Sequence, residues 1–160
     1  MSLFCKIEAE TEVLQAPSEK VYKFFKLRPY DLIKFPSTNI QSANLLEGDW
    51  GSKGCLVRWN YSYEGKAISD KEMVEAIDDK NRSITWKMVE GHLITKIYKS
   101  FKAVIQVTPK GDDGCVVRFI MEYEKPNEET MDPHGKLQFS LNLCKEITAY
   151  LMEEQSQVAP

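Results

Sequence analysis

Three side chains in this sequence combine a hydrogen-bonding or proton-carrying group with a position where it could meet a bound molecule. Tyr61 and Tyr123 each end an alternating stripe of apolar residues, so either phenol could donate a hydrogen bond to a ligand carbonyl. Because a buried tyrosine usually finds a partner within the protein, a structural hydrogen bond is the alternative. His92 lies in a turn between two strand-like segments. It could be a general acid or base near neutral pH, or an exposed loop histidine.

The sequence leaves the roles of three charged residues open. Lys136 lies at the start of a helical pattern, where it could reach the entrance of a binding site or remain a solvated surface lysine. Asp70 and Glu72 lie on a strand whose inward face is ambiguous. The alternating charges around them also fit a solvated strand edge. The two carboxylates are therefore left unassigned.

A glycine-rich loop offers another kind of chemistry, phosphate binding. Gly48, Gly51 and Gly54 do not match the G-x-x-x-x-G-K-[ST] spacing, and no helical pattern follows them. Residues 55–61 instead alternate in the manner of a half-buried strand. We therefore interpret the loop as a turn whose glycines adopt positive φ angles, with nucleotide binding as the alternative.

The cysteines and histidines do not form the groupings that a metal site or a catalytic thiol requires. Cys5, Cys55, Cys115 and Cys144 are spread along the chain without a CxxC pair. The chain has only two histidines, too few for a multi-histidine metal site and a poor supply for a Cys-His nucleophile. We expect the cysteines to pack as small hydrophobic residues, and we expect neither a metal nor a cofactor.

Composition sets the class of protein. A chain of 160 residues with 42% hydrophobic and 28% charged residues predicts one globular domain, which we place at 1–155 with a flexible tail at 156–160. The net charge of −3 and the lack of a basic block predict no nucleic-acid partner. No apolar run reaches the ~18 residues that would span a bilayer, and the N-terminal segment lacks signal-peptide anatomy. These features predict a cytoplasmic protein with no membrane partner.

The periodicity of the apolar residues predicts the elements that must position the candidates. The opening segment alternates in the manner of a strand with one wet face. Helical patterns follow, one starting near Pro17 and Ser18 and a shorter one bounded by Pro29 and Pro36. From Ile40 to Lys125 the chain consists mostly of strands and turns, including one long strand-like run that begins at Leu93.

A long amphipathic helix of about five turns closes the chain, because apolar residues recur at helical spacing from 137 to 151. The order is one strand, two short helices, six strands and one long helix, which predicts an α+β fold with helices on one face of an antiparallel sheet. A single helix is a narrow cover for that sheet. We therefore expect space between a curved sheet and the helix, where a ligand could bind.

Several segments of the sequence also resemble one known family. They are "KIEAETEV" at the start, the glycine loop "EGDWGSKG", "SITWKMVEG", "YKSFKAVIQVTPKGDDGCVV" and, in the last helix, "ITAYL". In order and spacing they resemble the plant major latex proteins, within the superfamily of birch-pollen-allergen (Bet v I), pathogenesis-related and START-like proteins. The resemblance covers essentially the whole chain. It implies the helix-grip fold, in which a seven-stranded antiparallel sheet wraps around a long C-terminal helix.

The same resemblance implies a function. Relatives bind small hydrophobic metabolites in an internal cavity, and some assist the cyclisation or isomerisation of reactive terpenoid or alkaloid intermediates without a cofactor. We find no inward lysine on the strands that matches the catalytic lysine of the family's Pictet-Spengler enzymes. The implied role is therefore a cofactor-free cyclase or isomerase. The alternative is a carrier, storage or defence-response protein without turnover, and either would be a monomer or weak homodimer.

The apolar stripes give the candidate ligand-binding residues, each of which could also be ordinary core. A lining rich in aromatic residues and methionine suits an apolar ligand. On the strands the candidates are Val57, Trp59, Ile84, Trp86, Met88, Phe101, Ala103, Phe119 and Met121, with Ile105 and Val117 on the same stripes. On the helices they are Phe25, Leu32, Lys136, Phe139, Ser140, Leu143 and Ile147.

Overall fold

One antiparallel sheet forms the body of the protein. The computed structural model describes residues 3–13 and 15–158. The strands are β1 (Leu3–Val13), β2 (Ile40–Glu47), β3 (Leu56–Tyr63), β4 (Lys66–Asp78), β5 (Ser83–Glu90), β6 (Ser100–Lys110) and β7 (Gly114–Lys125). They lie in the order β1-β7-β6-β5-β4-β3-β2, which confirms the predicted seven-stranded α+β fold.

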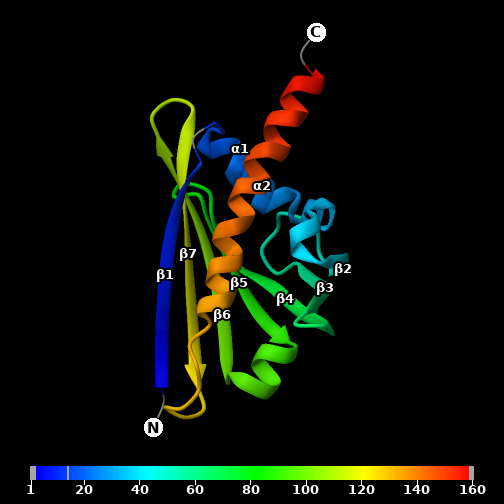
Figure 1. The fold of residues 1–160 in the computed structure, drawn as a ribbon, viewed down its shortest axis with the longest axis vertical. Coiled ribbons are helices and arrows are strands. Elements are labelled where there is room, and N and C mark those ends of the chain that lie inside the picture. The colour runs from blue at the N-terminus through cyan, green and yellow to red at the C-terminus, as the bar shows by residue number, and fades with distance from the viewer. Residues whose placement is uncertain (1–2, 14, 159–160) are drawn as a thin grey trace.

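The helices gather on one face of this sheet. They are α1 (Ser18–Leu27), the 3-10 turns η1 (Pro29–Lys34) and η2 (Pro36–Thr38), the π-helical turn η3 (Leu93–Ile97) and α2 (His134–Val158). Figure 1 shows α2 lying along the sheet, with β1 and β7 to its left and β3 and β4 to its right. Within the expected tail, 156–158 belong to α2 and the last two residues lie outside the described part of the chain.

The long strand predicted from Leu93 is wrong over its first turn. Residues 93–97 form η3 instead, closed by a hydrogen bond from the Tyr98 N–H to the Leu93 carbonyl at 2.6 Å, and β6 begins only at Ser100. Ile94 and Ile97, three residues apart, both pack against the core. A three-residue spacing places two side chains on one face of a helical turn, which a strand does not do.

The glycine loop between β2 and β3 is confirmed as a turn. Gly48, Gly51 and Gly54 have φ angles of +76°, +88° and +90°, a region that side chains disfavour. Trp50 anchors the loop, because its ring lies 5.0 Å from that of Tyr30 in η1. The glycines therefore allow the chain to bend back from β2 to β3.

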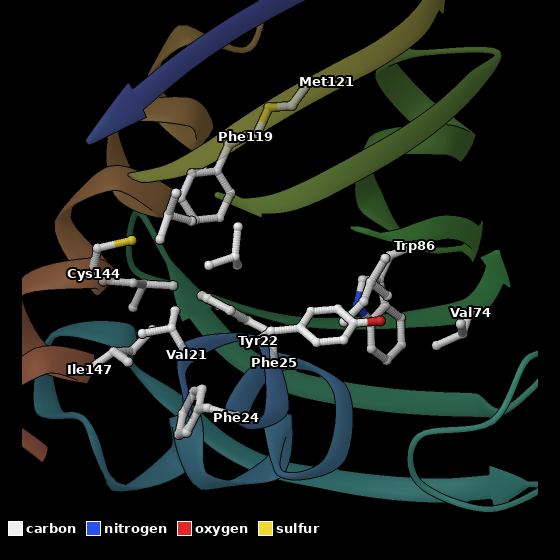
Figure 2. Packing of buried hydrophobic residues seen from close by; sticks show 14 of the residues in the cluster. Val21, Tyr22, Phe24, Phe25, Val74, Trp86, Phe119, Met121, Cys144 and Ile147 are labelled. Carbon is white, nitrogen blue, oxygen red and sulfur yellow. The ribbon is translucent and has the colours of Figure 1, made fainter. Parts of the chain in front are cut away.

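Aromatic residues of α1 join the helices to the sheet. Phe24 stacks on Phe35 with centroids 5.9 Å apart, and it meets the edge of Tyr150 from α2 at 6.0 Å. Phe25 points toward the sheet, where it contacts Phe119 of β7 at 6.2 Å (Figure 2). Because α1 packs on both α2 and the sheet, it closes one end of the space between them.

The helices cover the sheet unevenly. The closest backbone approaches of α2 are to β1 and β7, those of α1 are to β5, β6 and β7, and that of η1 is to β2. No helix backbone comes comparably close to β3 and β4 within the described residues. The inner faces of β3 and β4 are therefore covered mainly by side chains.

The role of Phe24 leads to the first prediction. Phe24→Ala should lower the free energy of unfolding by about 3–5 kcal/mol, because a buried aromatic ring that joins α1 to α2 is lost. Phe4→Ala is the matched control, since Phe4 is 73% exposed, and it should change stability by no more than about 0.5 kcal/mol. Urea unfolding monitored by circular dichroism measures both. Equal losses would contradict the assigned packing.

Candidate functional site

The register of β3 and β4 settles which way the unassigned carboxylates point. Trp59 is paired with Asp70, and Val57 with Glu72. Opposed residues in an antiparallel pair project to the same face of the sheet. Val57 and Trp59 belong to the buried core, so Asp70 and Glu72 also project to the inner face.

Asp70 is a fully buried carboxylate, 1% exposed, whose two oxygens are both bonded. The Tyr61 hydroxyl donates to Oδ2, and the backbone N–H of His92 donates to Oδ1 at 3.2 Å. Gly91 makes this approach feasible, since a Cβ at that position would lie 2.1 Å from Asp70 Oδ1. Asp70 thereby ties β3, β4 and the end of β5 together.

Tyr61 is held as a neutral phenol. Burial raises its pKa above the ordinary value, and the hydrogen bond to Asp70 and the charge of that carboxylate raise it further. Its proton is donated to Asp70 and is not available to a ligand. The structural hydrogen bond considered for Tyr61 is therefore present. The phenol oxygen can still accept a hydrogen bond from a ligand, but it cannot donate one while it is bonded to Asp70.

Glu72 differs from its neighbour Asp70. It is half-buried, and within the described residues its carboxylate has no hydrogen-bond or ion-pair partner. Its cross-strand neighbours are the apolar Val57 and Met88. Desolvation by burial raises the pKa of Glu72 to about 7, Lys136 opposes that rise, and the nearby charge of Asp70 adds to it.

Lys136 lies in the first turn of α2, and its charge acts on this carboxylate. The side chain is half-buried, and its ammonium lies 6.0 Å from the centre of the Phe101 ring, a cation–π distance. Its charge lowers the pKa of Glu72, so the two groups sense each other across the interior. No direct ion pair joins them in the described part of the chain.

His92 and Tyr123, the other candidates for chemistry, bond to different aspartates. His92 is half-buried, and its backbone, not its imidazole, bonds to Asp70. Tyr123 is buried and donates its hydroxyl to Asp132, which also pairs with Lys125 at 2.9 Å. Burial raises the pKa of Tyr123 most, and the hydrogen bond to Asp132 raises it further. Tyr123 therefore belongs to a network that fixes the segment leading into α2.

The two inner-face tryptophans form an edge-to-face pair. Trp59 and Trp86 lie on neighbouring inward stripes, as expected, with centroids 6.4 Å apart and an interplanar angle of 72°. Each is 8% exposed. The indole Nε1 of Trp59 is buried and has no hydrogen-bond partner among the described residues. The site thus contains one unsatisfied donor as well as one carboxylate without a partner.

The remaining candidates divide by burial. The half-buried ones are Leu32, Ala103, Ile105 and Ser140, whose hydroxyl donates to the Lys136 carbonyl at 3.0 Å. Phe139 lies more toward the surface than expected, at 36% exposed. The fully buried candidates are Phe25, Val57, Ile84, Met88, Phe101, Val117, Phe119, Met121, Leu143 and Ile147.

Ala103 and Ile105 are informative because they lie in the middle of the sheet. Both share the inner face with the buried Met121 and Phe119, their partners on β7. They nevertheless keep solvent-accessible surface of the same class as the outward Val104 between them. The inner face of β6 is therefore less completely packed than that of β7.

Two further findings concern other classes of site. Among the described residues, no three His, Cys, Asp or Glu side chains are grouped closely enough to hold a metal ion. None of the described helices has both the length and the apolar character needed to cross a membrane.

A long C-terminal helix set against a seven-stranded antiparallel sheet, with short helices closing one end, defines the helix-grip class. The sequence model of the pathogenesis-related protein Bet v 1 family matches residues 2–154, and the chain belongs to this family. The resemblance to major latex proteins is also confirmed. MLP-like protein 34 of Arabidopsis thaliana is 46% identical over 148 residues, which are 91% of this chain and 46% of that protein.

A second relative is matched over almost its full length. MLP-like protein 43 of Arabidopsis thaliana is 39% identical over 155 residues, 96% of this chain and 97% of that protein. The chain therefore spans about half the length of the first two curated relatives and nearly all of this one. The crystal structure of ginseng major latex-like protein 151 from Panax ginseng superposes with a TM-score of 0.84 at 35% identity, covering 92% of this chain and 97% of that one.

Gly91 gives a prediction about how Asp70 is held. Gly91→Ala should destabilise the protein by about 2–4 kcal/mol, because the new Cβ displaces a buried carboxylate from its hydrogen bonds. Gly54→Ala is the control, since Gly54 also has a positive φ of +90° but open space around it. It should lose only the ~1–2 kcal/mol of the backbone strain. Thermal unfolding of both variants measures the difference, and equal losses would refute the proposed contact.

Glu72 predicts a pH dependence of stability. Its pKa is raised from 4.5 to about 7 on folding, so the folded state holds the proton more tightly than the unfolded state. Wild-type stability should therefore fall between pH 4.5 and 7 and level off above, by up to about 3 kcal/mol from this group. Glu72→Gln removes that fall. The variant should match the wild type near pH 5 and exceed it at pH 8 in denaturant unfolding.

The control for this experiment is on the same strand. Glu75 pairs with Lys102 at 2.9 Å, and Lys102 lies between the inward Phe101 and Ala103, which places the ion pair on the outer face. Glu75→Gln should cost at most about 1 kcal/mol at pH 8. A difference between wild type and Glu72→Gln that is the same at both pH values would show that Glu72 does not carry a raised pKa.

Proposed function

We propose that this chain binds a small hydrophobic metabolite of terpenoid or alkaloid type between α2 and the inner face of the sheet, and that it assists the cofactor-free cyclisation or isomerisation of that molecule. The observation that carries the proposal is the incomplete packing of the inner face. Ala103, Ile105 and Glu72 project toward the helices yet keep accessible surface. Internal surface that side chains do not fill is available to a ligand.

The lining around that surface suits an apolar molecule with few polar groups. Trp59, Trp86 and Met88 provide aromatic and polarizable contacts on β3 and β5. An apolar pocket of this composition binds by shape and fixes orientation with few polar groups. The ligand is accordingly a compact, largely uncharged metabolite.

Catalysis in such a site needs no nucleophile or metal. Holding a flexible substrate in a conformation close to the transition state and excluding water together lower the barrier to an intramolecular reaction. The hydroxyls of Tyr61 and Tyr123 both donate to aspartates, so each phenol is held in one orientation within the binding site. The imidazole of His92 has no hydrogen bond to a described residue and is available to a bound substrate.

The second candidate function is carriage of the metabolite without turnover, in storage or in a defence response. It is supported by the same incompletely packed inner face, because binding alone requires no proton-transfer group. In either role we place the chain in the cytoplasm as a monomer or weak homodimer. A carrier would bind several unrelated hydrophobic compounds and return each unchanged. An enzyme would alter the rate or product ratio of a spontaneously cyclising or isomerising substrate.

The tryptophan pair provides the test of the binding site. Trp59→Phe and Trp86→Phe should each lose less stability than the ~3–5 kcal/mol of a large truncation in a packed core, because the void opens next to unfilled space. Replacing Trp59 also removes its unsatisfied N–H. Affinity for an uncharged hydrophobic probe such as N-phenyl-1-naphthylamine, followed by fluorescence, should change at least several-fold.

Trp50→Phe is the matched control, since Trp50 lies in the glycine loop against Tyr30. It should leave probe affinity unchanged. If the wild-type protein gives no saturable probe binding, or if only Trp50→Phe alters it, the proposed location of the ligand is wrong. Turnover is tested separately by comparing product distribution from a spontaneously cyclising substrate with and without protein. Identical ratios and rates would leave carriage as the function.

A further inference from the structure

Two opposite charges lie on the inner side of the fold and influence each other without forming an ion pair. Glu72 projects inward from β4 and Lys136 from the first turn of α2. A structural ion pair would bring the groups into direct contact, as Lys102 and Glu75 do at 2.9 Å on the outer face. No such contact joins Glu72 and Lys136 within the described residues. Neither charged group therefore has an ion-pair partner among the described residues, and each can bond to a ligand.

The other groups around Glu72 determine which ligand charge this site favours. From β3 the Tyr61 phenol faces it, from β4 the Asp70 carboxylate, and from β5 the apolar Met88. Two carboxylates against one ammonium disfavour an anionic ligand. A cationic ligand would pair with Glu72 and suppress its proton uptake. An uncharged ligand with a carbonyl oxygen suits both the ammonium and the carboxyl.

Of the acidic and phenolic groups here, Glu72 alone is free to exchange a proton with a ligand. Both oxygens of Asp70 accept hydrogen bonds from the protein, and the Tyr61 proton is directed at Asp70. The Glu72 carboxylate has no partner among the described side chains. A carboxyl that exchanges its proton near pH 7 is well matched to general base and general acid catalysis.

We propose that Glu72 and Lys136 form a proton-transfer site for uncharged, hydrophobic, enolisable carbonyl compounds. This inference rests on the proposed function and names its catalytic residues. The Glu72 carboxylate removes a proton from the carbon next to the carbonyl. The C–H electron pair becomes the new C=C bond, and the carbonyl π pair moves to oxygen. The ammonium of Lys136 stabilises the resulting enolate oxygen.

The proton then returns from the Glu72 carboxyl to carbon. Return to the original carbon restores the ligand, and return to the far end of an extended enolate moves a double bond, which is an isomerisation. Atoms, charge and electrons balance with no cofactor or oxidant. Enolisation also generates the nucleophilic carbon that an intramolecular cyclisation requires.

The test uses β-tetralone, an uncharged bicyclic ketone with acidic α C–H bonds, in heavy water. Binding is followed by tryptophan fluorescence, and replacement of the α protons by deuterium is followed by proton NMR. The wild-type protein should accelerate exchange above the buffer rate, with a rate that rises through about pH 7 and levels off above it, as the carboxylate form increases. Glu72→Gln should reduce the protein-dependent rate by about 100-fold or more, with affinity changed by less than about threefold.

Lys136 variants separate charge stabilisation from covalent amine catalysis. Lys136→Arg keeps the positive charge but cannot form an imine, so it should retain most of the exchange rate. Lys136→Met should lower the rate. It should also move the pH midpoint upward, because the cation that lowers the pKa of Glu72 is lost. Loss of activity in Lys136→Arg equal to that in Lys136→Met would overturn the assignment of Glu72 as the base. Glu75→Gln is the control and should match the wild type.

The outcomes distinguish the two levels of the account. If β-tetralone binds and exchange is not accelerated, or is equally fast in Glu72→Gln, the proton-transfer site is wrong while ligand binding stands. If β-tetralone and N-phenyl-1-naphthylamine both fail to bind the wild-type protein, the proposed function fails and this inference fails with it.

Discussion

The structure depends on the coverage of a wide curved sheet by a narrow helix. Seven strands present an apolar inner face that must be removed from water, and hydrophobic burial is the dominant favourable term in folding. α2 approaches β1 and β7 closely, while α1 and η1 close one end. Within the described residues, no helix backbone comes comparably close to β3 and β4. The half-buried Glu72 on β4 fits that uneven coverage.

The same sheet also buries two carboxylates, Asp70 and Glu72, and their loss of hydration costs free energy. A carboxylate removed from water requires hydrogen bonds or charges to compensate for lost hydration. Asp70 receives that compensation from Tyr61 and from the backbone at His92, with Gly91 providing the close approach. Glu72 receives little, and its raised pKa is the consequence. Functional sites commonly contain polar groups that lack a full set of protein partners, because only such groups can form hydrogen bonds or exchange protons with a ligand.

The sequence predicts the fold far better than the site. Alternating apolar residues locate the strands, and a helical stripe locates α2, because both periods are imposed by one buried face. The prediction failed at 93–97, where a run of β-branched and aliphatic residues forms a π-helical turn. Such short runs favour either structure, and the core contacts of Ile94 and Ile97 decide between them.

The inward carboxylates could not be assigned from the sequence for a physical reason. Apolar residues lie on both faces of β4, with Val74 inward and Met73 beside it on the opposite face. Irregularities in pairing near Glu72 and after Val74 also shift the phase of the alternation. The register with β3 and β5 identifies the inner face. The aspartate partners of Tyr61 and Tyr123 likewise come from tertiary approach, so the sequence left structural and catalytic roles for both phenols open.

The most direct test of this account is the titration of Glu72 itself. Carbon-13 NMR of the side-chain carboxyl groups, with Glu72 assigned by its loss in Glu72→Gln, reports the ionisation of each glutamate as a function of pH. We expect one carboxyl to titrate near pH 7, and to titrate at higher pH in Lys136→Met. If the Glu72 signal titrates near the ordinary glutamate value of about 4.3, the carboxyl is solvated, and an interior proton-transfer site is contradicted.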